Sequence, residues 1–208
     1  MLTYKFPWAY ELTFKIPPNL IFRKKSLNYL VKELQKVKNP KKILDIGCGS
    51  GMLTPILKKI YPKSEILGID KSPQMIEFAK KKYSPIANFK TIDVLDTEDK
   101  YDLIVAFYSF QFIPLELGIK RIKKLLNTGG VCIIITPGKA PFSLVHRFLS
   151  SILLRVNYWL YSPADFYTVL QKDVVANPHV RLNKLQLKLI SELEGNYILK
   201  VKSVKLKV

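Results

Sequence analysis

Three aspartates and a run of glycines form the most distinctive chemical pattern in the sequence. The run Asp45-Ile46-Gly47-Cys48-Gly49-Ser50-Gly51 continues a short apolar stretch and leads into a helix-like pattern. A strand that turns through glycines into a helix presents bare backbone N–H groups and a positive dipole end to a ligand. Asp70 and Asp93 each follow a further apolar stretch. The pattern is typical of a nucleotide site in which carboxylates accept hydrogen bonds from the ligand.

The spacing of the glycines limits which nucleotide the loop can bind. The dinucleotide fingerprint G-x-G-x-x-G needs a third glycine where this sequence has Met52. A P-loop needs Gly-Lys-Ser or Gly-Lys-Thr, and the glycine run contains neither. The loop is therefore nucleotide-like, but its pattern does not predict a pyrophosphate site.

The elements that position these residues alternate between strands and helices. We expect strands at residues 43–46, 65–70, 89–92, 101–107 and 131–136. We expect helices that begin at Ser26 as N-cap, follow Gly51, open at Ser72-Pro73, and span residues 115–126 before a stop at Asn127-Thr128-Gly129-Gly130. Residues 185–190 and 197–206 flank Glu194-Gly195-Asn196 and predict a closing hairpin. The predicted class is α/β: a Rossmann-like doubly wound sheet, mostly parallel, with a C-terminal antiparallel β-hairpin.

This order of elements, with the glycine loop after the first strand and an acid at the end of the second, resembles the class I S-adenosylmethionine-dependent methyltransferases. The resemblance covers about residues 41–136 and, loosely, the terminal hairpin. It implies S-adenosyl-L-methionine as cofactor. Within residues 107–112, Phe110-Gln111-Phe112 resembles the Phe-Gln-Trp of some small-molecule methyltransferases.

The resemblance also implies roles for individual residues. Asp70 matches the acid that takes both ribose hydroxyls, a task suited to a carboxylate, and Asp93-Val94 matches the pair beside adenine. The implied cofactor-binding set is Asp45, Gly47, Cys48, Gly49, Gly51, Asp70, Lys71, Met75, Asp93, Val94 and Phe107. Met75 matches a side chain packed on the adenine ring, and Phe107 begins the segment that lines the methyl-transfer end. We assign no metal ligands.

Catalysis by this chemistry needs alignment more than acid–base groups, because a sulfonium is already a strong electrophile. A proton acceptor is needed only where the attacking atom is a poor nucleophile. Tyr108 and His146 are the candidates that we carry forward. His146 lies beside Arg147, so a second interpretation places it at the surface or behind the site.

Charge and cysteine content bear on partners and compartment. The 208 residues include 34 basic and 16 acidic side chains, a net charge of +18. Such an excess favours a polyanion, either nucleic acid or an anionic membrane surface. The alternative is that scattered lysines merely form solvated faces. The N-terminus has no signal-peptide pattern, and the two cysteines form no disulfide framework, so we expect a cytoplasmic protein.

We expect a single methyltransferase domain over residues 1–208, with two elements on the substrate side. One is an aromatic, lid-like N-terminal arm of about residues 1–25, and the other is a helical insertion of about residues 137–180. Within the insertion, an apolar stripe over residues 140–161 lies at helical spacing, with Arg147 and Arg155 among the remaining positions. This pattern suits an interfacial helix or ordinary core packing.

Two functions therefore stay open. The favoured one is methylation of a hydrophobic small molecule, an isoprenoid quinone precursor or a lipid-like acceptor, with peripheral contact to anionic membrane. The alternative is an RNA-directed methyltransferase that uses the basic surface. Residues 106–109, Ala-Phe-Tyr-Ser, lack the Asn/Asp-Pro-Pro-aromatic motif of enzymes that methylate amino groups of adenine or glutamine.

Overall fold

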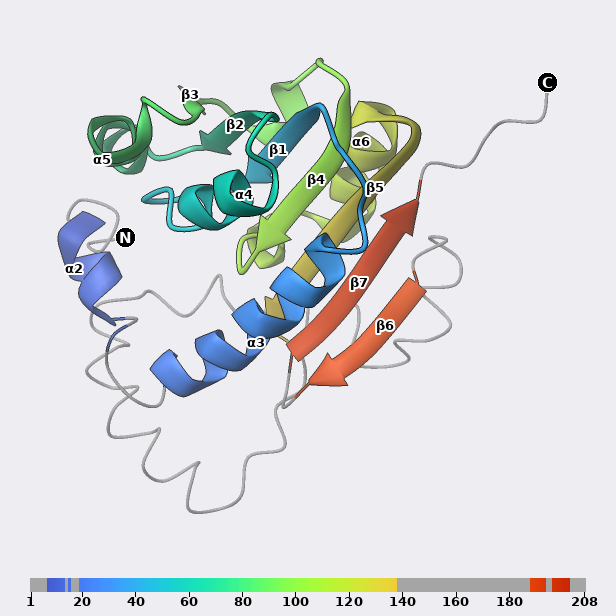
Figure 1. The fold of residues 1–208 in the computed structure, drawn as a ribbon, viewed down its shortest axis with the longest axis horizontal. Coiled ribbons are helices and arrows are strands. Elements are labelled where there is room, and N and C mark those ends of the chain that lie inside the picture. The colour runs from blue at the N-terminus through green and yellow to red at the C-terminus, as the bar shows by residue number, and fades with distance from the viewer. Residues whose placement is uncertain (1–6, 14, 16–18, 138–187, 194–195, 203–208) are drawn as a thin grey trace.

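The computed structural model describes residues 7–13, 15, 19–137, 188–193 and 196–202. Within these residues seven strands form one sheet, in the order β3-β2-β1-β4-β5-β7-β6 (Figure 1). The strands are β1 (Lys42–Ile46), β2 (Glu65–Asp70), β3 (Asn88–Thr91), β4 (Tyr101–Phe107), β5 (Leu126–Pro137), β6 (Lys188–Leu193) and β7 (Asn196–Lys202).

The first five strands are parallel and the last two are not. β1 pairs in parallel with both β2 and β4, and β5 pairs in parallel with β4. β7 runs antiparallel to β5 and forms a hairpin with β6. The predicted doubly wound, mostly parallel sheet with an antiparallel C-terminal hairpin is confirmed. The strand order reverses direction between β1 and β4, which is where sheets of this kind bind ligands.

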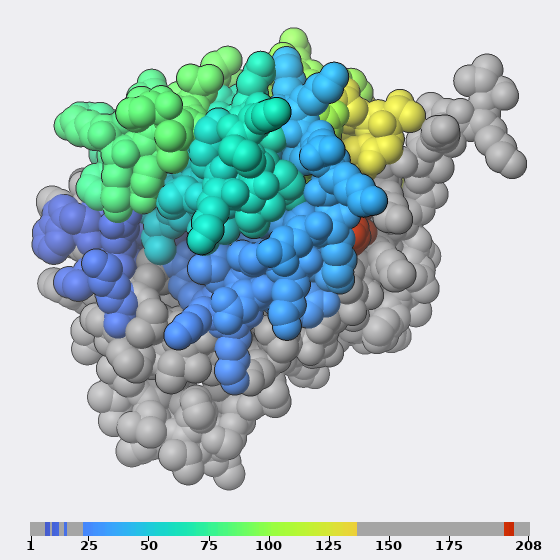
Figure 2. Space-filling model, in the orientation of Figure 1, coloured from blue at the N-terminus to red at the C-terminus, as the bar shows by residue number. Residues whose placement is uncertain are grey.

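Helices cover both faces of the sheet. They are α2 (Pro7–Thr13), α3 (Asn19–Leu34), α4 (Thr54–Ile60), α5 (Pro73–Tyr83) and α6 (Leu115–Leu125), with short 3-10 turns η1 (Val94–Asp96) and η2 (Phe110–Phe112). α3, α4 and α5 pack on one face, and α6 packs on the other with η1 and η2. α3 and α4 lie side by side on the face turned to the viewer in Figure 2.

Alternation along the strands builds the two halves of the core. Leu44 and Ile104 point to the α6 side, while their neighbours Ile43 and Leu103 point to the side of α3 and α4. All four side chains are fully buried. Because side chains alternate between the faces of a strand, an apolar run without polar interruptions predicts a strand buried on both faces.

Two predicted helix boundaries are wrong. The helix expected to begin at Ser26 begins at Asn19, directly after Pro17-Pro18, so Ser26 lies inside α3. Its hydroxyl is buried and bonds the Tyr108 hydroxyl at 2.9 Å instead of capping a helix. Leu126, expected in the last helix, begins β5 by pairing with Tyr101. The predicted stop at residues 127–130 bulges from that strand, where Gly129 has a φ of +80°.

Parts of the substrate-side predictions fall outside the described residues. His146, Arg147 and Arg155 lie in residues 138–187, which the structure does not describe, so the predicted insertion stays a prediction. Of the N-terminal arm, residues 7–13 form α2, which an ion pair between Glu11 and Lys82 (3.0 Å) joins to α5. Across the described part of the chain, every helix is too short or too polar to span a bilayer.

Candidate functional site

A pocket of about 480 Å³ opens at the carboxyl ends of β1, β2 and β4. It lies at the reversal of strand order, where the sheet topology predicts a ligand site. Its lining comprises Tyr10, Ile46, Gly47, Gly49, Ile69, Asp70, Lys71, Ser72, Gln74, Ile92, Asp93, Val94, Tyr108, Ser109, Phe112 and Ile113. A larger cavity of about 910 Å³ lies elsewhere, between α3 and α4, and contains none of the predicted site residues.

Asp70 stands at the centre of this pocket, at the end of β2. One carboxylate oxygen accepts the Gly49 N–H at 2.9 Å, and the other accepts the Ser72 N–H at 2.9 Å. Burial raises the pKa of Asp70, and the N–H donors of Ser72, Gly49 and Lys71 act against that rise. These N–H groups hold the Asp70 carboxylate in place. Because each oxygen has a second lone pair, the carboxylate can still accept two hydrogen bonds from a ligand.

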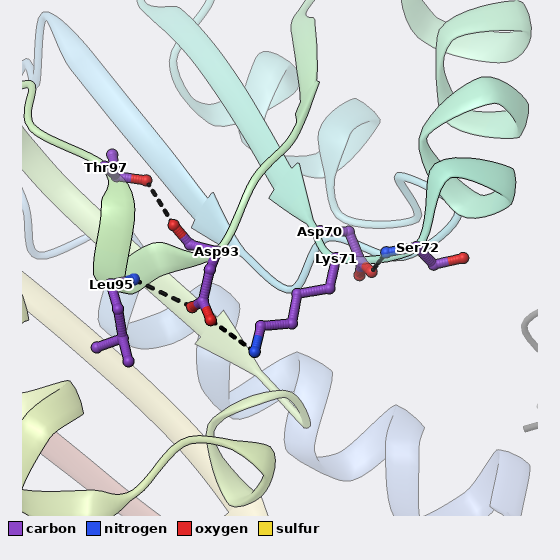
Figure 3. A network of polar contacts seen from close by, with 6 residues as sticks. All are labelled: Asp70, Lys71, Ser72, Asp93, Leu95 and Thr97. Carbon is purple, nitrogen blue, oxygen red and sulfur yellow. Dashed lines mark hydrogen bonds and ion pairs between the residues drawn. The ribbon is translucent and has the colours of Figure 1, made fainter.

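Asp93 stands at the end of β3 and faces Lys71. One Asp93 oxygen accepts the Leu95 N–H at 3.0 Å, and the other lies 2.5 Å from the Lys71 ammonium (Figure 3). Burial alone would raise the pKa of Asp93, but the Lys71 and Leu95 donors together bring the pKa below its ordinary value. The carboxylate is therefore ionised at neutral pH and able to accept a hydrogen bond from an amine.

The glycine loop forms the wall of the pocket beside Asp70. Gly49 has a φ of +53°, which side chains rarely tolerate, and a Cβ there would lie 3.7 Å from the Tyr10 ring. At Gly47 a Cβ would overlap Ser109. Gly51 is not part of the lining, and a Cβ there would lie 2.8 Å from the Tyr83 ring of α5. Gly47 and Gly49 thus shape the pocket, whereas Gly51 lets α5 pack closely.

The segment after β4 forms a second wall, which meets the glycine loop at Ser109. Tyr108 lines the pocket with an unusual φ of +55°, and the Gln111 amide donates to its carbonyl at 2.8 Å. The Arg23 guanidinium lies 5.7 Å from the centre of the Tyr108 ring. Ser109 donates to the Ile46 carbonyl at 2.5 Å, which ties this segment to the end of β1. Phe112 is 37% exposed and gives this wall an apolar surface.

Besides Gly51, four other predicted cofactor residues lie outside the lining. Asp45 and Cys48 are buried, and burial raises the pKa of both; that of Asp45 rises to about 8. Met75 is fully buried, and its neighbour Gln74 lines the pocket in its place. The reason is helix phase, since α5 is capped by Ser72 and turns Met75 inward. Phe107 packs edge-on against Tyr108, with the ring centres 4.8 Å apart.

Sequence reasoning assigned Gly47, Gly49, Asp70, Lys71, Asp93 and Val94 to the site, and all six line the pocket. Tyr108, a catalytic candidate, also lines it. The prediction missed Tyr10, Ser72 and Gln74 as site residues. Ser72 was visible only as a helix cap, and Tyr10 only as one of several aromatic residues near the N-terminus.

Comparison with known proteins gives matches to methyltransferases. Residues 21–173 match a family model described as a methyltransferase domain. A protein named as a methyltransferase in Invertebrate iridescent virus 6 is 30% identical over 161 residues, covering 73% of this chain and 58% of that protein. The malonyl-[acyl-carrier protein] O-methyltransferase of Priestia megaterium is 40% identical over 114 residues, covering 52% and 41%.

Among solved structures, the fold resembles a protein of Methanococcus maripaludis described as an S-adenosyl-L-methionine-dependent methyltransferase. The TM-score is 0.67 at 21% identity, and the match covers 100% of this chain and 97% of that one. In contrast, the chain spans only 41% to 58% of the length of the two curated relatives above.

Proposed function

The chain belongs to the class I S-adenosylmethionine-dependent methyltransferases, and we propose that it transfers a methyl group from S-adenosylmethionine to a hydrophobic small molecule. The position of Asp70 is the observation that supports S-adenosylmethionine as the methyl donor. Its carboxylate is fixed by two backbone N–H groups beside the glycine loop, and it lines the pocket at the reversal of strand order.

The residues of the pocket fit an adenosyl cofactor. Asp70 retains two free acceptor positions for the vicinal hydroxyls of ribose, and the ionised Asp93 suits the exocyclic amine of adenine. Ile69, Ile92 and Val94 supply apolar surface between the two carboxylates. When bound, S-adenosylmethionine supplies a methyl group on a sulfonium.

The acceptor proposal rests on the wall formed after β4. Phe112, Ile113 and the Tyr108 ring make this side of the pocket apolar, and Tyr10 of α2 adds a further aromatic ring. Apolar walls favour a hydrophobic acceptor, such as an isoprenoid quinone precursor or a lipid-like molecule, and they exclude water from the reacting atoms. The P. megaterium relative is named for a different acceptor, malonyl-[acyl-carrier protein]. The described residues offer no observation that favours RNA.

Tyr108 remains our candidate for a group near the acceptor. Its hydroxyl bonds Ser26 of α3, so the ring is held at the pocket wall between α3 and β4. We propose that it orients the acceptor, because methyl transfer depends on holding the attacking atom in line with the methyl group. His146 stays a second candidate on sequence grounds alone.

We also propose peripheral contact with anionic membrane. The net charge of +18 supports this contact, as does the amphipathic pattern of residues 140–161 with Arg147 and Arg155. A lipid-like acceptor would be reached most directly from such a surface.

Isothermal calorimetry tests the cofactor, and a methyl-transfer assay tests the acceptor. The purified chain should bind S-adenosylhomocysteine in preference to NAD and ATP. With S-adenosylmethionine as donor, apolar phenols and fatty acids should be methylated faster than a malonyl thioester. Preferential binding of NAD would overturn the cofactor assignment. Methylation of the malonyl thioester alone would overturn the acceptor assignment and leave the cofactor assignment intact.

A further inference from the structure

The most unusual contact in the pocket is the ion pair between Lys71 and Asp93. Lys71 directly follows Asp70, and its side chain extends from the end of β2 to the end of β3 (Figure 3). The ammonium lies 2.5 Å from one Asp93 oxygen, while the other oxygen already accepts the Leu95 N–H. Each Asp93 oxygen therefore already has one donor before any ligand arrives.

The exposure of the two side chains allows the Lys71 ammonium to move away from Asp93. The Lys71 side chain is 73% exposed, whereas that of Asp93 is 21% exposed. An exposed ammonium loses little when it returns to water, because surface ion pairs contribute little net stability. Asp93, in contrast, is fixed by its hydrogen bond to the backbone of η1. A ligand amine can thus displace the ammonium without moving the carboxylate.

In the structure the Lys71 ammonium pairs with Asp93 and not with the neighbouring Asp70. The Asp70 oxygens accept the N–H groups of Gly49 and Ser72, and the Lys71 side chain extends away from Asp70 and Ser72 toward Asp93 (Figure 3). The ammonium consequently stays at the base end of the pocket, where it meets whatever group the base presents.

We propose that Lys71 competes with the adenine amine for Asp93 and thereby narrows the preference of the pocket for adenine over hypoxanthine. This inference rests on the proposed function. Adenine presents an amine, which competes with the ammonium for the Asp93 oxygen that the ammonium contacts. Hypoxanthine presents a carbonyl oxygen at the same position, which Asp93 repels and Lys71 can hydrogen-bond. Lys71 therefore weakens binding of the adenine ligand and strengthens binding of the hypoxanthine ligand. It is thus a residue that sets base specificity.

The variant Lys71→Met tests this, because it keeps an apolar stem of similar length and removes the charge. By calorimetry at low ionic strength, it should bind S-adenosylhomocysteine about 1.5- to 5-fold more tightly than the unmodified chain, a range set by the usual strength of exposed ion pairs. It should bind the analogue with hypoxanthine in place of adenine more weakly. Added salt should bring the unmodified chain toward the variant for the adenine ligand, since salt screens the pair.

Two controls separate competition from general effects. Lys81→Met removes an equally exposed lysine, paired with Glu77 at 2.7 Å on α5 outside the pocket, and should change neither affinity. In an Asp93→Asn background, Lys71→Met should no longer tighten adenine binding. Weaker or unchanged binding of S-adenosylhomocysteine by Lys71→Met would overturn the inference while leaving the proposed function in place. Failure of the unmodified chain to bind S-adenosylhomocysteine would instead overturn the proposed function.

Discussion

Replacing Asp70 with alanine should remove most of the affinity for the cofactor. The change takes away the acceptors that we assign to two ribose hydroxyls, and each buried polar group left without a partner costs about 1–3 kcal/mol. The sum is about 2–6 kcal/mol, which corresponds to a loss of affinity between roughly 30-fold and roughly 10⁴-fold. Calorimetric titration with S-adenosylhomocysteine measures it directly.

The same variant also loses contacts inside the protein, so the loss needs a matched control. Asp70→Ala leaves the N–H groups of Gly49 and Ser72 without their carboxylate. Asp102 has a similar structural role at the opposite end of the sheet, where one oxygen accepts the N–H groups of Lys41 and Lys42 at 2.8 and 3.0 Å. Asp102→Ala should therefore lower thermal stability by a similar amount and leave cofactor affinity unchanged.

A ligand without the ribose 2′-hydroxyl completes the test. The unmodified chain should bind 2′-deoxy-S-adenosylhomocysteine more weakly than the parent ligand, whereas Asp70→Ala should bind the two ligands alike. The reasoning is refuted if Asp70→Ala keeps full affinity. It is also refuted if the variant still discriminates between the two ligands, since the carboxylate would then not be the partner of that hydroxyl.

Three further predictions concern the loop, a buried acid and the undescribed segment. Gly49→Val should abolish binding of S-adenosylhomocysteine in calorimetry while circular dichroism shows a retained fold, because a branched side chain resists the positive φ and fills the space toward Tyr10. Normal affinity would show that this loop is not the binding wall. Burial, with the charge of Asp70 nearby, raises the pKa of Asp45 to about 8. The contribution of Asp45 to the free energy of unfolding is therefore complete below about pH 4. It is lost as the pH rises toward 8, by at most about 1.4 kcal/mol per pH unit. Denaturant unfolding should show a flatter pH dependence for Asp45→Asn, and identical slopes would contradict the burial argument. Exchanging Arg147 and Arg155 for glutamate should weaken sedimentation with anionic vesicles by about 1 kcal/mol for each residue and leave cofactor affinity unchanged. Undiminished sedimentation would remove the support for membrane contact.

The strands were predictable because their apolar runs are continuous. β2 and β4 have the bounds expected from the sequence, and β1 differs by one residue. Helix starts were less predictable, since a serine before an apolar pattern resembles a cap wherever it stands. Ser26 fits the local rule, yet the helix already begins at Asn19, and the serine is used for a contact with Tyr108, distant in sequence.

The residues of the site likewise differ in how far the sequence could predict them. Asp70 and Asp93 were identifiable because Asp70 ends β2 and Asp93 closely follows β3, and the topology of a parallel sheet brings such ends together. The Lys71–Asp93 contact depends on how far apart β2 and β3 end, which no local pattern contains. Met75 lies in the core while Gln74 lines the pocket, because one residue of helix phase decides which way a side chain at the start of α5 points.

The strand reversal between β1 and β4 also divides the pocket into two parts that come from different stretches of the sequence. Most of the proposed adenosyl side comes from one continuous stretch, from Ile46 to Val94, whereas the apolar wall comes from Tyr10 and residues 108–113. Exchange in the second part that keeps Ser109, which bonds the Ile46 carbonyl, should therefore change the proposed acceptor without rebuilding the cofactor site. A chimera that takes only residues 108–113 from a relative is the smallest exchange that could transfer the choice of acceptor. Retained binding of S-adenosylhomocysteine would show that the cofactor site tolerates exchange of the apolar wall.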